Sequence, residues 1–488
     1  MMLLLMVSQT CGFSTLCFPP ERWASVSWQT LNGSVERTGV QQLTANLSTY
    51  SVKWESTTQG HIWANAVVGD INNDGQMEII VGALDSTIYA FNGSDGTIIW
   101  TYTTGGSIWS SPTLADVDGD DTVDVIVGSN DNRLYVLNGP TGIPLWSYQT
   151  GSWIEAPTLV FDCDGDGKAE IFFGSLDWKL YALDEAGNLL WTYSARNMVR
   201  SPAVADDLDG DGTDEIVFGS ADSTLYAVRC TDGSLLWNTS LDNEVRGSLS
   251  VGDIDGDGVP EVIAGTLSGT LYALNGEDGS ILWSYSAGSS FESVPSIYDV
   301  NGDDSLDVVA GTEDATLYLL SGPSGRLIWS VGVTDGYKWV PAPLNIVADI
   351  DPTSDGVEII ESVDYSTCCG ITVVSSTGDI IWQDNLFDHN SVSLADIDND
   401  GCSEIITVGA KTDTTGAVAV IDGPDNTGGC SLLGESGELN VGEAVSPDGS
   451  VDGPRYYNAS GRFYSTPPDR PGLYFEVRDG RVRKVLRR

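Results

Sequence analysis

A tryptophan recurs along most of the chain at a nearly constant interval. Successive members are 45 or 46 residues apart, except for a last interval of 53 residues. Between them the sequence repeats four short apolar runs bounded by Gly, Asp, Asn or Pro, which is typical of short strands and tight turns. A circular array of such four-stranded sheets is a β-propeller. The eight recurring residues are Trp54, Trp100, Trp146, Trp191, Trp237, Trp283, Trp329 and Trp382.

The register of the repeats predicts how the ring closes. The series begins with a tryptophan strand at residues 52–54 and ends with the third strand of a repeat at residues 417–421. We therefore expect an all-β, eight-bladed propeller of four-stranded antiparallel blades in which the first tryptophan strand completes the last blade. Closure of this kind removes exposed sheet edges, whereas an open β-solenoid would need capping ends, which the sequence does not show.

The repeats resemble two known repeat families. The segment LYALNGEDGSILW (271–283) and its copies are similar to the tryptophan-docking repeat of pyrroloquinoline-quinone-type propellers. The D-x-D-x-D-G-x-x-E loops, each followed by a strand and a glycine, resemble the FG-GAP repeats of integrin α heads. The resemblance covers residues 54–423 and implies the fold more than any activity, because propellers host unrelated functions.

Each repeat carries an acidic loop between its first and second strands. Oxygen-bearing side chains stand at loop positions 1, 3, 5 and 9, and position 6 is usually glycine. Such loops suit Ca²⁺, which takes six to eight oxygen ligands, and the FG-GAP resemblance also implies calcium. In chain order, the predicted ligands of loops 1 to 8 are Asp70, Asn72, Asp74 and Glu78; Asp116, Asp118, Asp120 and Asp124; Asp162, Asp164, Asp166 and Glu170; Asp207, Asp209, Asp211 and Glu215; Asp253, Asp255, Asp257 and Glu261; Asp299, Asn301, Asp303 and Asp307; Asp349, Asp351, Asp355 and Glu358; and Asp396, Asp398, Asp400 and Glu404.

The eight loops are not equivalent. Loops 3, 4, 5 and 8 are complete, whereas Asn72 and Asn301 each remove one charge from loops 1 and 6. Asp121 and Asp304 occupy the glycine position of loops 2 and 6, which predicts a strained turn. Loop 7 carries an insertion. EF-hands are excluded because position 12, for example Val81, lies in an apolar strand. We expect up to eight calcium ions in a structural role and no organic cofactor; the alternatives are simple turns or a calcium-sensing role.

The net charge of −48 belongs to the repeats. Residues 54–423 hold 59 acidic and ten basic residues, and 30 of those acids occupy predicted ligand positions. A surface coated with acids throughout, as in halophiles, is therefore disfavoured. An acidic chain of this kind also disfavours nucleic-acid binding. No run of 18 apolar residues is present, so no transmembrane helix is expected.

One position varies between repeats instead of recurring. It lies seven residues before the first aspartate of each loop, at the opposite end of the innermost strand. Around one mouth of the central channel it reads Trp63, Trp109, Glu155, Arg200, Arg246, Glu292, Ala342 and His389, with Trp339 just before the seventh. Aromatic rings beside charged groups suit a carbohydrate, an acidic ligand or a peptide end; the alternative is a solvated rim. Arg133, Trp178 and Lys179 would extend the same face.

No catalytic residue is predicted, because the familiar nucleophile, zinc, phosphate-loop and dinucleotide motifs are missing from the sequence. Two enzymatic alternatives remain. In a polysaccharide lyase, Arg200, Arg246 and His389 would neutralise a uronate and move a proton. In a quinone-dependent dehydrogenase, which the resemblance to pyrroloquinoline-quinone-type propellers implies, Cys368 and Cys369 would form the adjacent-cysteine disulfide of that family.

Both ends of the chain differ from the repeats. Residues 1–20 are interpreted as a weak or truncated secretion signal or a disordered start, residues 21–51 as a lead-in, 52–423 as the propeller and 424–454 as a linker. Residues 455–488 resemble the end of a type IX secretion sorting domain, which implies export; a small β-hairpin is the alternative. Eight cysteines fit an oxidising compartment, and their pairing is left open.

Together these features predict an exported, monomeric, calcium-binding propeller. It would act as a binding or adhesion module, extracellularly or at the cell surface. The predicted partner is a carbohydrate or an extracellular protein or peptide. The leading alternative is a lyase-type enzyme that acts on polysaccharides.

Overall fold

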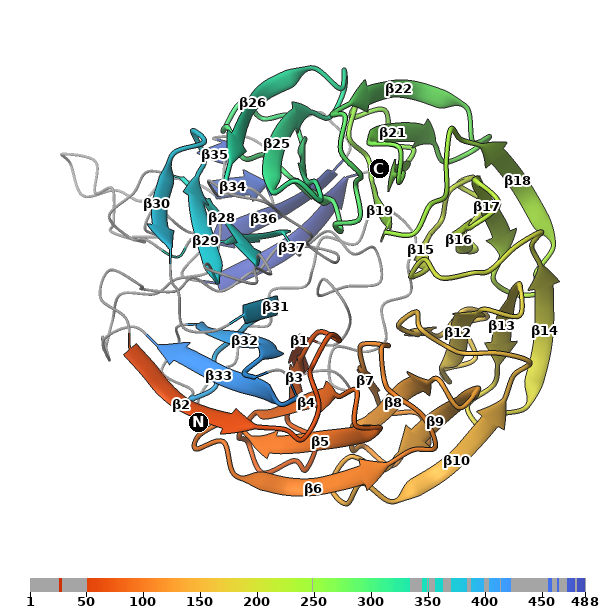
Figure 1. Ribbon diagram of the computed structural model, residues 1–488. Coiled ribbons are helices and arrows are strands. Elements are labelled where there is room, and N and C mark those ends of the chain that lie inside the picture. The colour runs from red at the N-terminus through yellow and green to blue at the C-terminus, as the bar shows by residue number, and fades with distance from the viewer. Residues whose placement is uncertain are drawn as a thin grey trace. The chain divides into compact units, whose positions relative to one another are not determined.

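The computed structural model contains a ring of antiparallel sheets (Figure 1). It describes residues 51–333 except residue 248, and residues 345–348, 350, 356–362, 370–383, 388–398, 403–412 and 414–422. It also describes the backbone of β1 (Val26–Trp28) and of four strands beyond residue 454. The predicted residues Trp339, Ala342, Asp349, Asp351, Asp355, Cys368, Cys369 and Asp400, and the side chain of His389, lie outside these described parts.

Six blades follow one another from the innermost strand to the tryptophan strand. They are blade 1, β3 (Val67–Gly69), β4 (Glu78–Gly82), β5 (Thr87–Asn92) and β6 (Ile98–Thr103); blade 2, β7 (Thr113–Ala115), β8 (Asp124–Ser129), β9 (Arg133–Leu137) and β10 (Pro144–Gln149); blade 3, β11 (Leu159–Phe161), β12 (Glu170–Ser175), β13 (Lys179–Leu183) and β14 (Leu189–Ser194); blade 4, β15 (Val204–Asp206), β16 (Glu215–Ser220), β17 (Thr224–Arg229) and β18 (Leu235–Ser240); blade 5, β19 (Leu249–Gly252), β20 (Glu261–Gly265), β21 (Thr270–Asn275) and β22 (Ile281–Ser286); and blade 6, β23 (Ser296–Tyr298), β24 (Asp307–Gly311), β25 (Thr316–Ser321) and β26 (Leu327–Gly332).

The last two blades close the ring. Blade 7 contains β27 (Asn345–Ala348), β28 (Glu358–Ser362), β29 (Ile371–Ser375) and β30 (Ile380–Gln383). Blade 8 contains β31 (Asp388–Ala395), β32 (Glu404–Ala410), β33 (Gly416–Asp422) and, as its outermost strand, β2 (Ser51–Thr57). Trp54 of β2 lies opposite Val420 of β33, and Figure 1 shows these two ends of the ring side by side. The predicted eight-bladed propeller and its mode of closure are therefore confirmed.

Blade 1 differs from the prediction because it has five strands. The backbone of β1 pairs with the innermost strand β3, where Val26 lies opposite Gly69. The inner edge of a blade presents unpaired backbone groups to the channel, and an added strand satisfies some of them. The lead-in carries no copy of the repeat, so its sequence could not indicate this pairing.

The recurring tryptophans dock each blade onto the next. The indole nitrogen of Trp54 donates a hydrogen bond to the carbonyl oxygen of Gly93 at 2.7 Å, and Trp237 donates to Gly276 at 2.6 Å. The Trp54 ring also packs on Gly96, which has φ +71° and where an added Cβ would lie 2.3 Å from the ring. Apolar side chains fill the spaces between adjacent blades, so the ring is a continuous packed structure.

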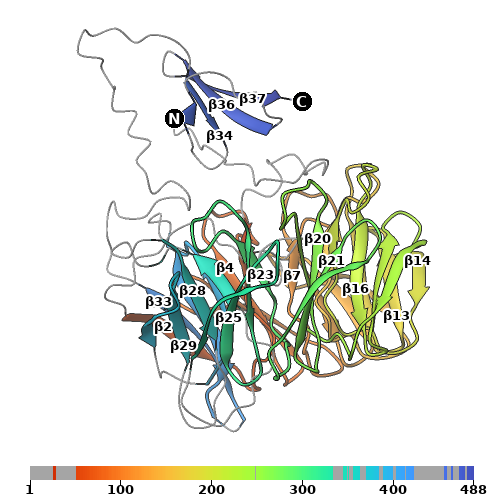
Figure 2. The ribbon, with the colours of Figure 1, turned by 90° about the horizontal axis from the view of Figure 1, so that it is seen from above.

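The chain divides into two compact units: one comprises residues 11–430, with the propeller, and the other includes residues 431–488, with the last four strands. These are β34 (Arg455–Asn458), β35 (Phe463–Tyr464), β36 (Gly472–Arg478) and β37 (Arg481–Arg487), in the order β35-β34-β36-β37. Figure 2 labels three of them, β34, β36 and β37. This antiparallel sheet covers the segment that resembles a sorting domain. Among the described residues, no helix is long and apolar enough to cross a membrane.

Candidate metal loops and channel mouth

In the first six acidic loops, the first carboxylate accepts hydrogen bonds from backbone amides of its own loop. In loop 3, Asp162 Oδ1 accepts hydrogen bonds from the amides of Gly165 at 2.8 Å and Asp166 at 3.1 Å, and Oδ2 accepts one from Gly167 at 2.8 Å. Short acidic side chains favour such turns because they bond to backbone two or more residues ahead. The sequence thus encodes the loop conformation and the acidic cluster with the same residues.

In each of the first six loops, the residue at position 6 has a left-handed backbone conformation. Glycine holds it in four of them, with φ +85° at Gly167 and +92° at Gly258. Asp121 and Asp304 adopt the same conformation, with φ +66° and +67°. The strained turn expected at these two aspartates is present, since a residue with a Cβ pays about 1–2 kcal/mol for it.

The carboxylate at position 9 is the most buried acid of the loop. Asp124 and Glu261 are 0% exposed and Glu404 is 1% exposed. One oxygen of each accepts the backbone amide of position 2, at 3.2, 2.9 and 2.6 Å respectively. The other oxygen of each is buried without a hydrogen-bond partner. Such an oxygen is costly unless a cation binds it.

Burial dominates the electrostatics of position 9. It raises the pKa of Glu78, Asp124, Glu170 and Glu261 to about 7, and the neighbouring loop carboxylates add to the effect. The pKa of Glu404 rises to about 9 for the same reasons. The hydrogen bond from position 2 opposes these shifts but does not cancel them. Each loop therefore disfavours a full set of ionised acids unless positive charge is added.

Among the described residues, five loops bring three acids close enough to hold one metal ion. In each set, ligand oxygens of positions 1, 3 and 9 lie within 4.8 Å of one another. The sets are Asp116, Asp118 and Asp124; Asp162, Asp164 and Glu170; Asp207, Asp209 and Glu215; Asp253, Asp255 and Glu261; and Asp396, Asp398 and Glu404. All five donor sets consist of oxygens, which fits a hard cation such as Ca²⁺. In three of them, those of Asp124, Glu261 and Glu404, the position-9 acid also has a buried oxygen without a partner.

The remaining predicted ligands fall outside these five sets. At position 5, Asp166 Oδ1 accepts the Lys168 amide at 2.9 Å and so continues the loop's own turns. Loops 1 and 6 carry asparagine at position 3, and Asn301 Nδ2 lies 3.5 Å from Asp307 Oδ1. In loop 7, Glu358 Oε2 accepts the amide of Ile350 at 2.8 Å, as position 9 does elsewhere.

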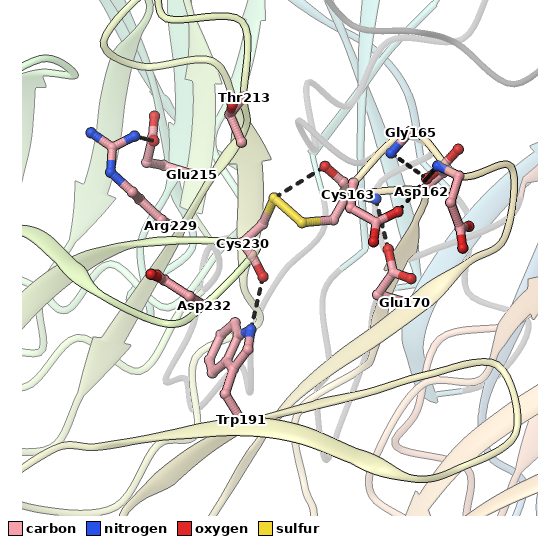
Figure 3. The surroundings of a disulfide bond; sticks show 12 residues. Asp162, Cys163, Gly165, Glu170, Trp191, Thr213, Glu215, Arg229, Cys230 and Asp232 are labelled. Atoms are coloured by element: carbon pink, nitrogen blue, oxygen red, sulfur yellow. Dashed lines mark hydrogen bonds and ion pairs between the residues drawn. A yellow bond between two sulfur atoms is a disulfide. The ribbon is translucent and has the colours of Figure 1, made fainter.

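Loop 4 contains a basic residue that the sequence analysis did not connect with it. Arg229, at the end of β17, extends its guanidinium into the loop and contacts Asp209, Asp211 and Glu215. Figure 3 shows Arg229 directed at Glu215. The signal was available, because the corresponding residues of blades 1, 2 and 5 are Asn92, Asn138 and Asn275.

A disulfide joins loop 3 to blade 4. Cys163, at position 2 of loop 3, is bonded to Cys230, which directly follows Arg229 (Figure 3). In blades 1, 2, 5 and 6 the Cys230 position is a glycine that lies against position 2 of the preceding loop. For example, a Cβ on Gly322 would lie 3.0 Å from Ile254 Cβ. Aligned repeats therefore contained the signal for the pair, which the sequence analysis left open.

The variable residues pair across neighbouring blades, and we call this end of the ring the mouth end. Trp63 and Trp109, from blades 1 and 2, have ring centroids 4.7 Å apart at 70°. Arg200 Nε lies 3.4 Å from Glu155 Oε2, between blades 3 and 4. Arg246 Nη1 lies 3.9 Å from Glu292 Oε2, between blades 5 and 6. The structure thus brings six of the predicted mouth residues together in pairs.

Two further tryptophans lie at the mouth end of blade 3. Trp153 and Trp178 are 47% and 52% exposed, unlike the docking tryptophans. Trp178 occupies the tip of the β12–β13 hairpin with φ +76°, where blade 2 has Asn132 with φ +69°. Trp153 was missed in the sequence analysis because it stands nine, not seven, residues before its loop. Nearby in the same hairpin, Lys179 Nζ lies 6.0 Å from the Tyr181 ring centroid.

Three family models match parts of the chain. Residues 103–261 match a PQQ-type repeat model described as outer membrane protein assembly factor BamB. Residues 227–338 match the lambda-carrageenase β-propeller domain, and residues 70–127 match the FG-GAP-like repeat. No curated protein matches the sequence. The two repeat resemblances expected from the sequence are confirmed.

Solved structures share the fold at low identity. The quinohemoprotein alcohol dehydrogenase from Comamonas testosteroni has a TM-score of 0.63 and 12% identity, over 83% of this chain and 82% of that chain. A europium-containing methanol dehydrogenase has a TM-score of 0.62 and 12% identity, over 81% of this chain and 98% of that chain. BamB from Moraxella catarrhalis has a TM-score of 0.55 and 15% identity, over 76% of this chain and 98% of that chain. These likenesses establish the propeller architecture alone.

Proposed function

We propose that this protein is an exported, calcium-stabilised β-propeller that binds a polysaccharide at its mouth end. One observation carries the proposal. Where a pure scaffold would repeat one residue, the mouth end has the Trp63–Trp109 pair and two Arg–Glu pairs from successive blades. Rings beside hydrogen-bonding charged groups are suited to sugar rings and their hydroxyl or acidic substituents.

The exposed tryptophans of blade 3 support a carbohydrate ligand. A half-exposed tryptophan leaves part of an apolar ring in water, and a left-handed backbone conformation is unfavourable for a residue with a large side chain. Trp178 combines both features, and Trp153 stands at the same end of the blade. Such costs are common at binding sites. The match of residues 227–338 to the propeller domain of a carrageenase points in the same direction.

Calcium as the metal is supported by the chemistry of the loops. The donor atoms are oxygens, they lie within 4.8 Å of one another, and the position-9 acids of loops 2, 5 and 8 keep one buried oxygen without a partner. Calcium accepts mixed carboxylate and carbonyl oxygens in flexible geometry. The ions would stabilise the connections between first and second strands, while the opposite end remains free for the ligand.

Export is supported by the disulfide between Cys163 and Cys230. Disulfides persist in oxidising compartments and are rare in the cytosol of most organisms. The resemblance of residues 455–488 to a sorting domain agrees with the same location. We therefore propose an extracellular or cell-surface binding or adhesion module.

A second candidate is an enzyme that acts on a polysaccharide. The carrageenase family match favours it, and so does the pairing of Arg200 and Arg246 with carboxylates. An arginine can neutralise an acidic sugar while a neighbouring carboxylate exchanges a proton. Depolymerisation assays on neutral, uronate-containing and sulfated polysaccharides separate this candidate from binding alone.

The experiment that tests the binding proposal is affinity electrophoresis through gels containing those polysaccharides. We expect retardation by at least one of them, and loss of retardation in Trp63→Ala and Trp109→Ala. Ile143→Ala is the matched control, because Ile143 is 63% exposed in the turn before β10, at the loop end. Retardation by none of the polysaccharides, or equal retardation of all variants, would overturn the proposal.

A further inference from the structure

We infer that loop 4 contains its own cation: the guanidinium of Arg229 occupies the position that a calcium ion takes in the other complete loops, so loop 4 does not bind calcium. This inference rests on the proposed calcium binding and changes which loops carry it. By sequence, loop 4 is as complete as loops 3, 5 and 8. What sets loop 4 apart is Arg229, which belongs to β17, a strand outside the loop.

The guanidinium makes three contacts with the ligand carboxylates of loop 4. Arg229 Nη2 lies 2.8 Å from Asp209 Oδ2, and Nη1 lies 2.8 Å from Asp211 Oδ2 and 3.1 Å from Glu215 Oε1. The planar fork of arginine is suited to several carboxylates at once. These contacts involve ligand positions 3, 5 and 9, so the group lies among the atoms that would bind a metal.

The free oxygen of the position-9 carboxylate distinguishes loops 2, 5 and 8 from loop 4. In loops 2, 5 and 8, one oxygen of Asp124, Glu261 or Glu404 is buried without a hydrogen-bond partner. In loop 4, the corresponding atom, Glu215 Oε1, accepts a hydrogen bond from Arg229. Glu215 is 0% exposed, so its charge needs a partner inside the protein. Arg229 therefore gives the position-9 carboxylate of loop 4 the partner that this carboxylate lacks in loops 2, 5 and 8.

Strand register shows why Arg229 reaches this place. Glu215 lies directly opposite Arg229 across β16 and β17. In blades 1, 5 and 6 the residue at this cross-strand position is short and neutral. Asn92 lies opposite Glu78, Asn275 lies opposite Glu261, and Ser321 lies opposite Asp307. Those short neutral side chains leave the acidic oxygens uncompensated. A single difference in the third strand, arginine in place of a short neutral residue, thus replaces the metal ion of one loop by a side-chain cation.

Loop 8 shows that a nearby base is not sufficient. Lys53 Nζ lies 2.6 Å from Asp398 Oδ2 and 3.2 Å from Asp422 Oδ2. Asp422 is an additional acid at the cross-strand position, so it offsets the charge of Lys53. Glu404 still keeps one buried oxygen without a partner. Loop 8 therefore retains its metal site, whereas loop 4 does not.

The disulfide holds Arg229 in place. Cys230 follows it directly and is bonded to Cys163 in loop 3, and the Cys230 carbonyl accepts the Trp191 indole hydrogen bond at 2.8 Å (Figure 3). The end of β17 in blade 4 is therefore attached to blade 3 at two points. Moving the guanidinium out of loop 4 would require its side chain to swing into solvent.

The test counts bound calcium ions by equilibrium dialysis and by native mass spectrometry. Arg229→Asn, which installs the residue of blades 1, 2 and 5, should bind one ion more than the wild-type protein. Asn275→Arg, which places the same base opposite Glu261 in blade 5, should bind one ion fewer. Arg326→Asn is the matched control, because this exposed arginine lies in the turn after β25; its count should not change.

Asp209→Asn locates the effect. In the wild-type protein it should leave the count unchanged, and in the Arg229→Asn background it should remove the gained ion. A wild-type count that falls with Asp209→Asn, or no gain in a folded Arg229→Asn protein that still binds calcium elsewhere, overturns the inference. If the wild-type protein binds no calcium at all, the proposed calcium role fails instead.

Discussion

The two ends of the propeller differ in what repeats. At the loop end, the same acids recur in blade after blade, and the position-9 carboxylates are buried and tied to position 2. At the mouth end, the equivalent position changes from tryptophan to glutamate to arginine, and the side chains pair between blades. Repetition serves the scaffold, and variation marks the surface on which we place ligand binding.

Removal of calcium should produce the largest effect, because it acts on several loops at once. An ion present at about 100 times its Kd contributes about 2.7 kcal/mol to the native state. For several ions we expect EGTA to lower the melting temperature on the order of 10 °C. Differential scanning calorimetry measures this. Added Ca²⁺ should restore the transition and Mg²⁺ should not, and equal melting temperatures in all conditions would contradict a structural role.

The second-largest effect should be the pH dependence of the stability of the calcium-free protein. The pKa values of Glu78, Asp124 and Glu261 are raised to about 7 in the folded state, chiefly by burial. A raised folded pKa stabilises the protein fully below the unfolded pKa, and this stability is lost as pH rises through about 7. In EGTA, the melting temperature should therefore fall between pH 5 and pH 8. A rise over that interval would contradict these shifts.

With calcium present, the pH dependence should reverse. Protons compete with the ion for the position-9 carboxylates, so the stabilisation by calcium should shrink as pH falls. The melting curves with and without calcium are then expected to converge at low pH. Mouth-end variants such as Trp63→Ala should leave this convergence unchanged, because they are remote from the loops.

Single-loop variants should separate metal-dependent loops from loop 4. With calcium, Glu261→Gln should lower the free energy of unfolding by about 2 kcal/mol because one ion is lost. In EGTA the same variant should be neutral or stabilising, because a buried unpaired charge is removed. Glu215→Gln should cost about 1.5–3 kcal/mol in both conditions, because it weakens the bond to Arg229. Chemical denaturation with and without calcium measures all four values.

The smallest effect on stability is expected from a substitution at the mouth end. Trp178→Asn installs the residue that blade 2 has at this left-handed position, Asn132. The change should raise the free energy of unfolding by about 1 kcal/mol, because asparagine tolerates this conformation better than tryptophan. It should also weaken retardation by the polysaccharide. A loss of stability would show that Trp178 is a scaffold residue.

Much of the fold was predictable because the repeat is long and regular. The tryptophan spacing and the offset of Trp54 relative to Ile421 determined both the number of blades and their closure. The acidic loops were predictable as sequence motifs. Arg229 was not connected with loop 4, because it enters from a neighbouring strand and its role appears only in the register of β16 and β17.

Other features depended on comparing repeats position by position. The Cys163–Cys230 bond replaces a close contact between a glycine and an apolar side chain in other blades. Trp153 was not predicted, because it stands two residues before the variable position, which Glu155 occupies in this repeat. The added strand β1 had no repeated counterpart. Trp339 and the adjacent cysteines Cys368 and Cys369 remain predictions, as does any role of the His389 side chain.

The most direct test of the account is a crystal structure of the calcium-loaded protein with a bound oligosaccharide, in which calcium is located by anomalous scattering. We predict anomalous peaks in the loops that begin at Asp116, Asp162, Asp253 and Asp396, and none in the loop that begins at Asp207. We predict oligosaccharide density across Trp63 and Trp109. A peak beside Arg229, or a sugar bound at the loop end, would contradict the division of the propeller into a metal-binding end and a ligand-binding end.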